Sequence, residues 1–383
     1  MIKINKHFFI KILFVLFIIP FALVAQNEKD TVKNKEIKYP QFQFKGLFQG
    51  RYLAGLTKDV DLQGVHHTTG DFSTNSFDVK RMRVQVKGTI GAHTEVVALV
   101  NLADFKSDPK NKVLENAYIK YTFNKYIGLT LGQFRPWFGI EETYPVDIIK
   151  SMDFSNQYYE FGKNGWSSFQ IGATVNGSFD LNKVPVNYAF SVVNGNGRNQ
   201  EADVDNGKQY MSRIVFGLSK KNNINFGING GIGEVFTHKV YAFGADLTTD
   251  FQLSDKISLD MQLEMKQAIN HNLYFSIPVE NRIESLDMYQ MRGIYFLPNF
   301  RYAIKYKKLT AIEMSCRYEY MDTNFRLNSN ARQTIVPMLS LEFLKDYGAR
   351  IQMGVQIDRY KTTAINTSNY NKELFVFQVQ SRL

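Results

Sequence analysis

Apolar and polar residues alternate one by one along most of this chain from about residue 41 onward. In the segment 41–53, Phe42 and Phe44 fall on one side, while Gln43 and Lys45 fall on the other. Because successive side chains of a strand point to opposite faces, this alternation predicts a strand with one apolar and one wet face. The same pattern predicts sixteen strands, at about 41–53, 77–90, 93–105, 113–124, 128–135, 166–176, 184–194, 210–219, 224–234, 238–250, 255–269, 288–306, 309–322, 331–344, 347–360 and 372–382.

The connections between these segments alternate in length. Short links such as 91–92 and 124–127 take turns with long ones such as 54–76 and 136–165. Short turns at one rim, long loops at the other and an even strand count are typical of outer-membrane barrels. A soluble sandwich has no reason to sort its loops this way, and its strands are usually shorter. The pattern therefore predicts an all-β fold, a sixteen-stranded antiparallel transmembrane β-barrel.

Closure of the barrel has a consequence for its interior. In hydrocarbon every backbone donor and acceptor must be paired internally, and a sheet achieves this only by closing on itself. At sixteen strands the interior is too wide for side chains to fill, so water fills it. The polar faces of the strands are therefore expected, as a group, to line a channel. For any single polar residue, simple solvation of the wall is the better interpretation.

The stretch 136–165 breaks the alternation and is rich in aromatic and acidic residues. A disordered linker would be poor in aromatic residues, and long loops inside compact domains are usually functional. Because these aromatic side chains are costly to expose to water, we expect the third long loop to fold inward and narrow the bore. The alternative is a lid on the outer surface. The residues expected at the constriction are Trp137, Glu141, Glu142, Asp147 and Lys150.

The first 25 residues predict a secretory signal peptide. Lys3, Lys6 and Lys11 precede an apolar core at 12–23, and Ala25 offers a cleavage point. The apolar core is too short for a comfortable membrane span. We therefore expect the protein to be exported, and the barrel pattern places it in the outer membrane of a bacterium, in contact with lipid.

The rest of the chain shows no break in composition that would mark a second domain. Residues 26–40 are polar and without period, which predicts a flexible periplasmic lead, and residues 41–383 are expected to form one barrel domain. The single cysteine, Cys316, excludes a disulfide-stapled secreted scaffold. A mean hydropathy of -0.26 does not suit a helical membrane protein, but it suits a barrel in which half of every strand faces water.

Charge is distributed unevenly over the predicted wet faces. Removing the three signal lysines from a net charge of +10 leaves +7 for the mature chain. One side of the barrel forms a basic wall on strands one, two, four and five, made of Lys45, Arg51, Arg81, Arg83, Lys87, Lys120 and Arg135. The opposite half mixes arginines with a similar number of acids. A bore lined with cations selects anions, which predicts a preference for small anionic solutes that the loop acids moderate.

A motif at the start of the long loop adds a resemblance. The run from Gly132 to Gly139 reads Gly-Gln-Phe-Arg-Pro-Trp-Phe-Gly and is followed by Glu141 and Glu142. With the basic segment 80–83, it resembles the phosphate-selective porin O and P family. The likeness in motif covers about 77–140, and the likeness in layout covers the whole mature chain. The resemblance implies an outer-membrane porin, a homotrimer, whose third loop narrows a channel for phosphate-like anions.

Other patterns favour neither an enzyme nor a cofactor protein. His66 and His67 lack the further ligands of a metal site and indicate a solvated loop pair, so no metal or other cofactor is expected. We find no Ser-His-Asp or Cys-His arrangement with supporting context and expect no catalysis. The interleaving of basic and aromatic residues follows from strand alternation, so we expect no nucleic acid partner. The remaining alternative is a structural or adhesive barrel whose loops carry the function.

Overall fold

The computed structural model describes residues 38–106, 113–199, 203 and 205–382. The compact unit of the described chain begins at Tyr39. The predicted signal peptide and most of the predicted lead therefore lie outside the described residues. All the described strands and helices belong to the unit that begins at Tyr39.

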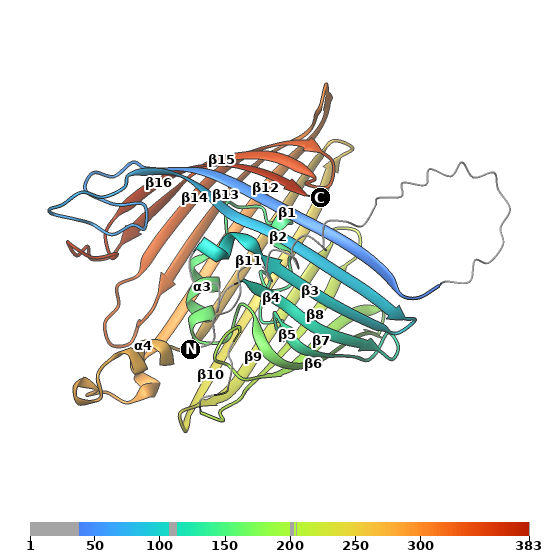
Figure 1. Ribbon diagram of the computed structural model, residues 1–383, viewed down its shortest axis with the longest axis horizontal. Helices are drawn as coiled ribbons and strands as arrows, with labels where there is room; N and C mark the ends of the chain where they lie inside the picture. The colour runs from blue at the N-terminus through green and yellow to red at the C-terminus, as the bar shows by residue number, and fades with distance from the viewer. Residues whose placement is uncertain (1–37, 107–112, 200–202, 204, 383) are drawn as a thin grey trace, which may run out of the picture. The chain divides into compact units, whose positions relative to one another are not determined.

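Sixteen strands form one closed antiparallel barrel (Figure 1). Each strand pairs with its neighbours in sequence, and β1 also pairs with β16, which closes the sheet. The predicted fold class and strand number are confirmed. The strands are β1 (Gln41–Gly55), β2 (Asn75–Gly91), β3 (Thr94–Asn101), β4 (Leu114–Thr122), β5 (Gly128–Phe134), β6 (Gln170–Leu181), β7 (Val184–Val193), β8 (Gln209–Ser219), β9 (Ile224–Val235), β10 (His238–Ser254), β11 (Ile257–Ile269), β12 (Gln290–Tyr306), β13 (Leu309–Asp322), β14 (Arg332–Leu344), β15 (Ala349–Tyr360) and β16 (Lys372–Arg382).

The two ends of the barrel differ in their connections, as the sequence predicts. One end, the short-turn end, carries links such as 92–93 and 123–127. The other, the long-loop end, carries connections such as 56–74 and 270–289. In outer-membrane barrels the short turns face the periplasm. These two ends define the position of a residue along the wall.

Short helices occur only in the connections of the described chain. They are η1 (Leu102–Lys106), η2 (Val146–Ile148), α3 (Asn156–Lys163), α4 (His271–Ser276), η3 (Val279–Asn281) and η4 (Leu286–Met288). None of these described helices is long and apolar enough to cross a membrane. Helix α3 lies in the loop where the strand alternation breaks. Its start is capped by Ser155, whose Oγ accepts from the backbone N–H of Tyr158 at 3.2 Å.

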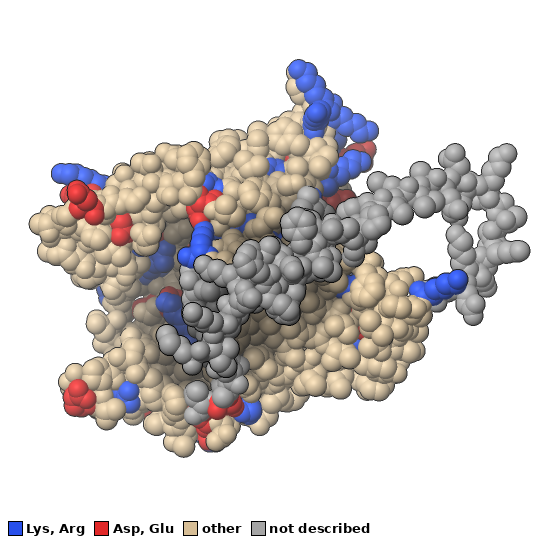
Figure 2. All heavy atoms as spheres, viewed as in Figure 1, with Lys and Arg blue, Asp and Glu red and all other residues tan. Residues whose placement is uncertain are grey.

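The strands present an apolar face outward and a polar face inward. Phe44, Leu131 and Ile232 are 70%, 59% and 67% exposed, whereas Gln49 and Glu264, on the other face, are at most 1% exposed. Figure 2 shows the same division, because charged side chains gather at the ends of the barrel and in its opening, and broad parts of the outer wall carry few. An apolar outer band suits contact with lipid, and a polar inner face suits water or other polar groups.

Candidate functional site: the bore and its inner loop

The connection from β5 to β6, residues 135–169, is called the inner loop here, and it lies against the polar faces of the strands. Three arginines of the wall donate to its main-chain carbonyls: Arg51 to Met152 at 2.7 Å, Arg317 to Asp153 at 2.5 Å and to Phe154 at 3.1 Å, and Arg350 to Asp147 at 3.1 Å and to Ile149 at 3.3 Å. These arginines come from β1, β13 and β15. Their donors satisfy loop carbonyls that strand pairing cannot reach, which is why a loop can sit there without orphaned backbone groups.

An apolar cluster anchors the other side of the inner loop. Phe138, Phe161 and Trp166 are fully buried and belong to one core cluster with wall residues such as Met211 of β8 and Met291 of β12. Burying aromatic rings of this size removes a large apolar area from water, which favours the seated loop. The aromatic residues of the loop are therefore packed against the wall, as their cost in water suggests.

A buried ionic cluster lies beside these rings. The Nζ of Lys266 on β11 lies 3.1 Å from Oε1 of Glu142 and 2.9 Å from Oε1 of Glu264, and all three side chains are inaccessible to solvent. Gly139 allows this approach, because a Cβ there would stand 1.9 Å from the Glu264 carboxylate and because its φ of +124° suits glycine. Glu142 thus binds the wall through Lys266.

Glu141 is also held by contacts within the inner loop. Its carboxylate accepts from the backbone N–H of Ser155 at 2.8 Å and from the Ser155 hydroxyl at 2.5 Å. Burial raises the pKa of Glu141 to about 8, with Glu264 and Glu142 adding repulsion and Arg317 opposing it. The predicted constriction acids Glu141 and Glu142 therefore serve the seating of the inner loop.

Two cations of the basic wall, Arg51 and Arg81, converge with Lys80 of β2 on a single acid of the inner loop. Asp153 lies 2.8 Å from Nζ of Lys80, 2.8 Å from Nη2 of Arg81 and 3.6 Å from Nη1 of Arg51. The register jumps here from Gln49 opposite Arg81 to Gly50 opposite Val79, so Lys80 has no partner on β1. This bulge lets two successive basic residues reach the same carboxylate. Burial alone would raise the pKa of Asp153, but the three cations hold that pKa well below its ordinary value.

Two further members of the predicted basic wall also have acidic partners. Nε of Arg83 lies 2.7 Å from Glu115 on β4, and Nζ of Lys87 lies 2.5 Å from Glu95 on β3. With Arg51 and Arg81, four of the seven predicted cations therefore pair with carboxylates. Alternation placed them correctly on the inner face, but it does not tell which acid faces them.

Lys45, Lys120 and Arg135 form the remaining set. Within the described residues no carboxylate lies within 4.0 Å of their charged nitrogens. Arg135 donates instead to the carbonyls of Glu141 at 3.1 Å and Tyr144 at 2.7 Å. It was predicted on the fifth strand, but β5 ends at Phe134 and Arg135 begins the inner loop. Within β5, shortly before this end, Gly132 has a φ of +130°.

These three cations line two adjoining cavities on the β1–β5 side of the bore. One, of about 230 Å³, includes Lys45 and Arg135, and the other, of about 240 Å³, includes Lys120 and Arg135. Both include Asn116 as well, so Arg135 and Asn116 stand between the two spaces. Trp137, a predicted constriction residue, lines the second cavity together with Lys120. Each cavity also includes one acid, Asp147 in the first and Glu142 in the second, and these acids pair with Arg382 and Lys266. Lys45, Lys120 and Arg135 have no ion pair of their own with a described carboxylate.

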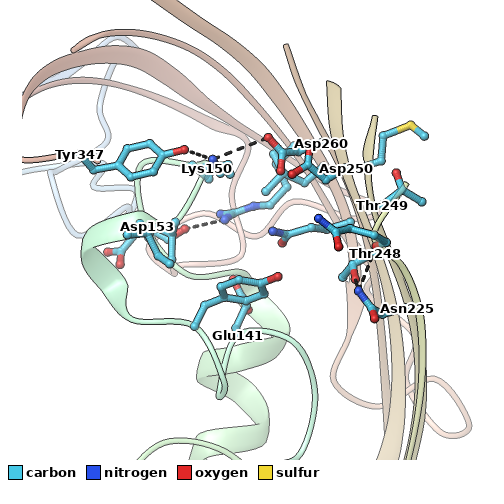
Figure 3. Close-up of a pocket in the computed structure, with 18 residues that line it drawn as sticks. Glu141, Lys150, Asp153, Asn225, Thr248, Thr249, Asp250, Asp260 and Tyr347 are labelled. Carbon is cyan, nitrogen blue, oxygen red and sulfur yellow. Dashed lines mark hydrogen bonds and ion pairs between the residues drawn. The ribbon is translucent and has the colours of Figure 1, made fainter. Parts of the chain in front are cut away.

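A third cavity, of about 290 Å³ and also lined by the inner loop, contains several acidic residues (Figure 3). Asp250 and Asp260 face each other across β10 and β11 and line it with Thr248. Lys150, a predicted constriction residue, reaches into this cavity and lies 3.7 Å from Asp260. Its charge is therefore matched by acids.

The sequence missed several residues that organise the bore. Asp153 could not be predicted because it lies in a loop without periodic pattern. Lys80 could not be predicted because a β-bulge changes which face of the strand its side chain points to. Asp147, predicted at the constriction, forms an ion pair with Arg382 at 2.7 Å. A Ser before a short aperiodic run is a helix-start signal, so Ser155 could have revealed α3.

The two histidines of the first long loop are not a solvated pair. His66 is buried and its ring lies 4.2 Å from that of Tyr370, and His67 Nε2 lies 2.8 Å from Asp61. His66 joins the first and last long loops and His67 is half-buried within the first, so the predicted solvation is wrong for His66. Among the described residues, no group of three potential metal-binding side chains occurs.

Comparison with known proteins agrees with this architecture. Residues 53–229, from β1 into β9, match the model of the family described as phosphate-selective porin O and P. No curated protein matches the chain. Three solved structures share the fold: an anion-selective porin from Comamonas acidovorans (TM-score 0.58, 6% identity, 90% of this chain and 100% of that one), the outer membrane channel DcaP of Acinetobacter baumannii (0.56, 12%, 90% and 97%) and OmpT of Vibrio cholerae in trimer form (0.53, 12%, 90% and 100%).

Identities of 6–12% support the fold alone, so the family match carries the functional statement. That match includes the basic strand β2, the Gly-Gln-Phe-Arg motif and the whole inner loop. The resemblance stated from the sequence is confirmed over this part of the chain. The closed barrel and the family match together identify the protein as a porin of the bacterial outer membrane, similar to the phosphate-selective porin O and P family.

Proposed function

We propose that this porin is an anion-preferring diffusion channel and that its anions pass through the two cavities lined by Lys45, Lys120 and Arg135. The observation that carries the proposal is the absence, among the described residues, of any carboxylate within 4.0 Å of these three cations. A cation whose charge is not matched locally attracts anions and repels cations from the water beside it.

The chemistry of the lining supports phosphate-like anions as the solute class. Arg135 offers a planar fork that matches the oxygens of phosphate or carboxylate, and the lysines act as point charges. The amide of Asn116 and the hydroxyl of Thr130 add neutral polar groups to the lining. The family description names phosphate, and the Comamonas porin of the same fold is anion-selective. Both point to the same class of solute.

The test is the reversal potential of purified protein in a planar bilayer under a potassium chloride gradient. We expect the double variant Lys45→Gln with Lys120→Gln to lower the anion-to-cation permeability ratio several-fold, because two unmatched charges leave the path. Open-channel conductance should change little, since neither lysine contacts the inner loop through a described hydrogen bond or ion pair. A reversal potential equal to that of the wild type would contradict the proposed path.

Lys125→Gln with Lys183→Gln is the matched control. Both lysines are exposed and lie in turns at the short-turn end, outside the lining of the two cavities. The control removes the same charge from the protein but not from the path. Similar shifts in both double variants would attribute selectivity to net charge, without a role for the cavities.

The inner loop and the assembly complete the proposed channel. We propose that the seated inner loop sets the width of the bore, because it contacts β1, β13 and β15 through their arginines. We also propose a homotrimer, which the trimer form of OmpT, a barrel of the same fold, supports. The detergent-corrected mass of the purified protein measures this assembly, and a monomer mass would contradict it.

A further inference from the structure

The short-turn end of the barrel is strongly basic. Its seven connections are 92–93, 123–127, 182–183, 220–223, 255–256, 307–308 and 345–348. Together they contain eight lysines and two acids, which gives a net charge of +6. The connections at the long-loop end, without the inner loop, contain nine lysines and arginines and eleven acids, which gives -2. The two ends of the barrel therefore carry net charges of opposite sign.

Five of the eight lysines lie on three successive turns, β8–β9, β10–β11 and β12–β13, and are called the lysine rim here. The lysine rim consists of Lys220, Lys221, Lys256, Lys307 and Lys308. Backbone hydrogen bonds tie each turn to the next hairpin. The N–H of Asp250 donates to the carbonyl of Asn222 at 3.0 Å, and the N–H of Ala303 donates to the carbonyl of Lys256 at 2.7 Å. The three turns are therefore fixed beside one another.

The charges of the lysine rim are not matched within the protein. All five residues are exposed, and none has its Nζ within 4.0 Å of a carboxylate of the described residues. The three turns contain a single acid, Asp255. In Figure 2 the short-turn end lies at the right, and blue side chains project from its tips. The ammonium groups are thus available to a partner outside the protein.

An apolar side chain of the outer wall adjoins each of these turns. Leu218, Leu253 and Tyr306 are 58%, 59% and 59% exposed, and they lie one to three residues before the nearest rim lysine. Nζ of Lys307 lies 5.5 Å from the centroid of the Tyr306 ring. At about 3.3 Å per residue, the separation along a strand is at most about 10 Å. The polar headgroup layer of one leaflet is about 5–8 Å thick, so the rim lysines lie at the level of lipid headgroups.

We propose that the lysine rim binds the headgroups of anionic phospholipids in the periplasmic leaflet of the outer membrane. Short turns of outer-membrane barrels face the periplasm, so the rim meets that leaflet. Phosphate oxygens of the headgroup accept from the ammonium groups, while the acyl chains lie against Leu218, Leu253 and Tyr306. A headgroup with a net negative charge, such as phosphatidylglycerol, is favoured because a zwitterionic headgroup brings a cation of its own.

The position of the charges favours a lipid over an acidic polymer of the cell wall. A polar polymer matches the ammonium groups alone. An amphipathic ligand matches both the ammonium groups and the exposed apolar side chains that stand next to them. The inference concerns the outer wall and its rim, and it does not depend on the ion preference of the bore.

The experiment measures the lipid selectivity of the mature protein in vesicles of phosphatidylcholine. Small amounts of spin-labelled phosphatidylglycerol or spin-labelled phosphatidylcholine are added, and electron spin resonance gives the fraction of label held at the protein surface. We expect phosphatidylglycerol to associate several-fold more strongly with the wild type. Added potassium chloride should reduce this preference, because salt screens exposed charges.

The rim variant is the quadruple substitution Lys220→Gln, Lys221→Gln, Lys307→Gln and Lys308→Gln. Each lysine near an anionic surface contributes up to about fivefold to association. We therefore expect the two labelled lipids to associate almost equally with this variant. Heat-modifiable mobility in electrophoresis verifies that each protein has folded.

The matched control removes four cations from the long-loop end by Lys58→Gln, Lys239→Gln, Arg326→Gln and Lys361→Gln. All four residues are exposed, and they lie in long-loop connections or at the long-loop end of β10. The control lowers the net charge by the same amount but leaves the lysine rim intact. It should keep the wild-type preference for phosphatidylglycerol.

Three outcomes overturn the inference. The first is equal association of both lipids with the wild type, and the second is an unchanged preference in the rim variant. The third is a similar loss in both quadruple variants, which would assign the preference to net charge. A rim variant that keeps its lipid preference but no longer sediments with isolated peptidoglycan falls under the second outcome and assigns the lysines to the cell wall. Reversal potentials test the proposed function separately, in bilayers of phosphatidylcholine alone.

Discussion

Two sets of cations line the same bore and have different tasks. The anchored set, Arg51, Arg81, Arg317 and Arg350, binds carboxylates or main-chain carbonyls of the inner loop. The free set, Lys45, Lys120 and Arg135, has no described carboxylate within 4.0 Å and lines open cavities. Both sets lie inside the barrel. A cation there is therefore a candidate for contact with solute where it lines an open cavity and no carboxylate pairs with it.

The physical reason for the anchored set is the backbone of the inner loop. A loop inside a barrel has carbonyls without strand partners, and a buried unpaired carbonyl is destabilising. Arginine has five donors in a rigid fork and can serve several carbonyls at once. The arginines of the anchored set contact the inner loop. The two lysines of the free set lie nearer the short-turn end of the barrel, away from the loop carbonyls.

The largest expected effect comes from breaking the buried cluster that seats the loop. Lys266→Met leaves the carboxylates of Glu142 and Glu264 together in a solvent-free site, and removal of one partner of a buried ion pair costs about 3–5 kcal/mol. The strands pair independently of this cluster, so the loss falls on the inner loop. We expect faster amide hydrogen exchange across residues 135–169 and a larger, noisier conductance.

Lys163→Met separates this effect from simple loss of a lysine. Lys163 lies in α3, and its ion pair with Glu160 is half exposed. Surface pairs contribute little to stability, so exchange and conductance should match the wild type. If Lys266→Met left the exchange of residues 135–169 unchanged, the cluster would not be what holds the loop.

A smaller effect separates two acid-paired arginines, Arg81 and Arg83, from the free set. The double variant Arg81→Gln with Arg83→Gln removes two positive charges, as the lysine double variant does. Unlike the lysine variant, it also leaves the carboxylates of Asp153 and Glu115 with fewer cationic partners. We expect the anion preference to weaken and the conductance and loop exchange to change with it. The lysine variant should alter the preference alone. Selectivity and loop exchange measured on both double variants test this split, and identical behaviour of the two would end the distinction.

The sequence predicts the barrel well because one rule repeats along it. Alternation with period two and sorted loop lengths define the strands, and together they placed Arg51 and Arg81 on the inner face. The inner loop obeys no such repeat. Lys80 reaches Asp153 only because of a bulge, and Lys266 meets Glu142 only because Gly139 leaves room for it. Contacts between distant segments depend on packing in three dimensions, which a periodic pattern does not record.

The smallest expected effect concerns the pH dependence of the seated loop. Burial raises the pKa of Glu141 to about 8 from an ordinary 4.5, so the seated loop holds a proton that an unseated loop releases between these values. Raising the pH from about 5 to 8 should therefore favour unseating, by at most about tenfold in the equilibrium per pH unit, with no further change above 8. Among the groups that face Glu141, Glu264 and Glu142 also raise its pKa, and Arg317 lowers it.

We expect current fluctuations of single wild-type channels to increase from pH 6 to pH 8. Glu141→Gln, which is neutral at every pH, should flatten this dependence, and a variant that keeps the full slope would assign it to another group.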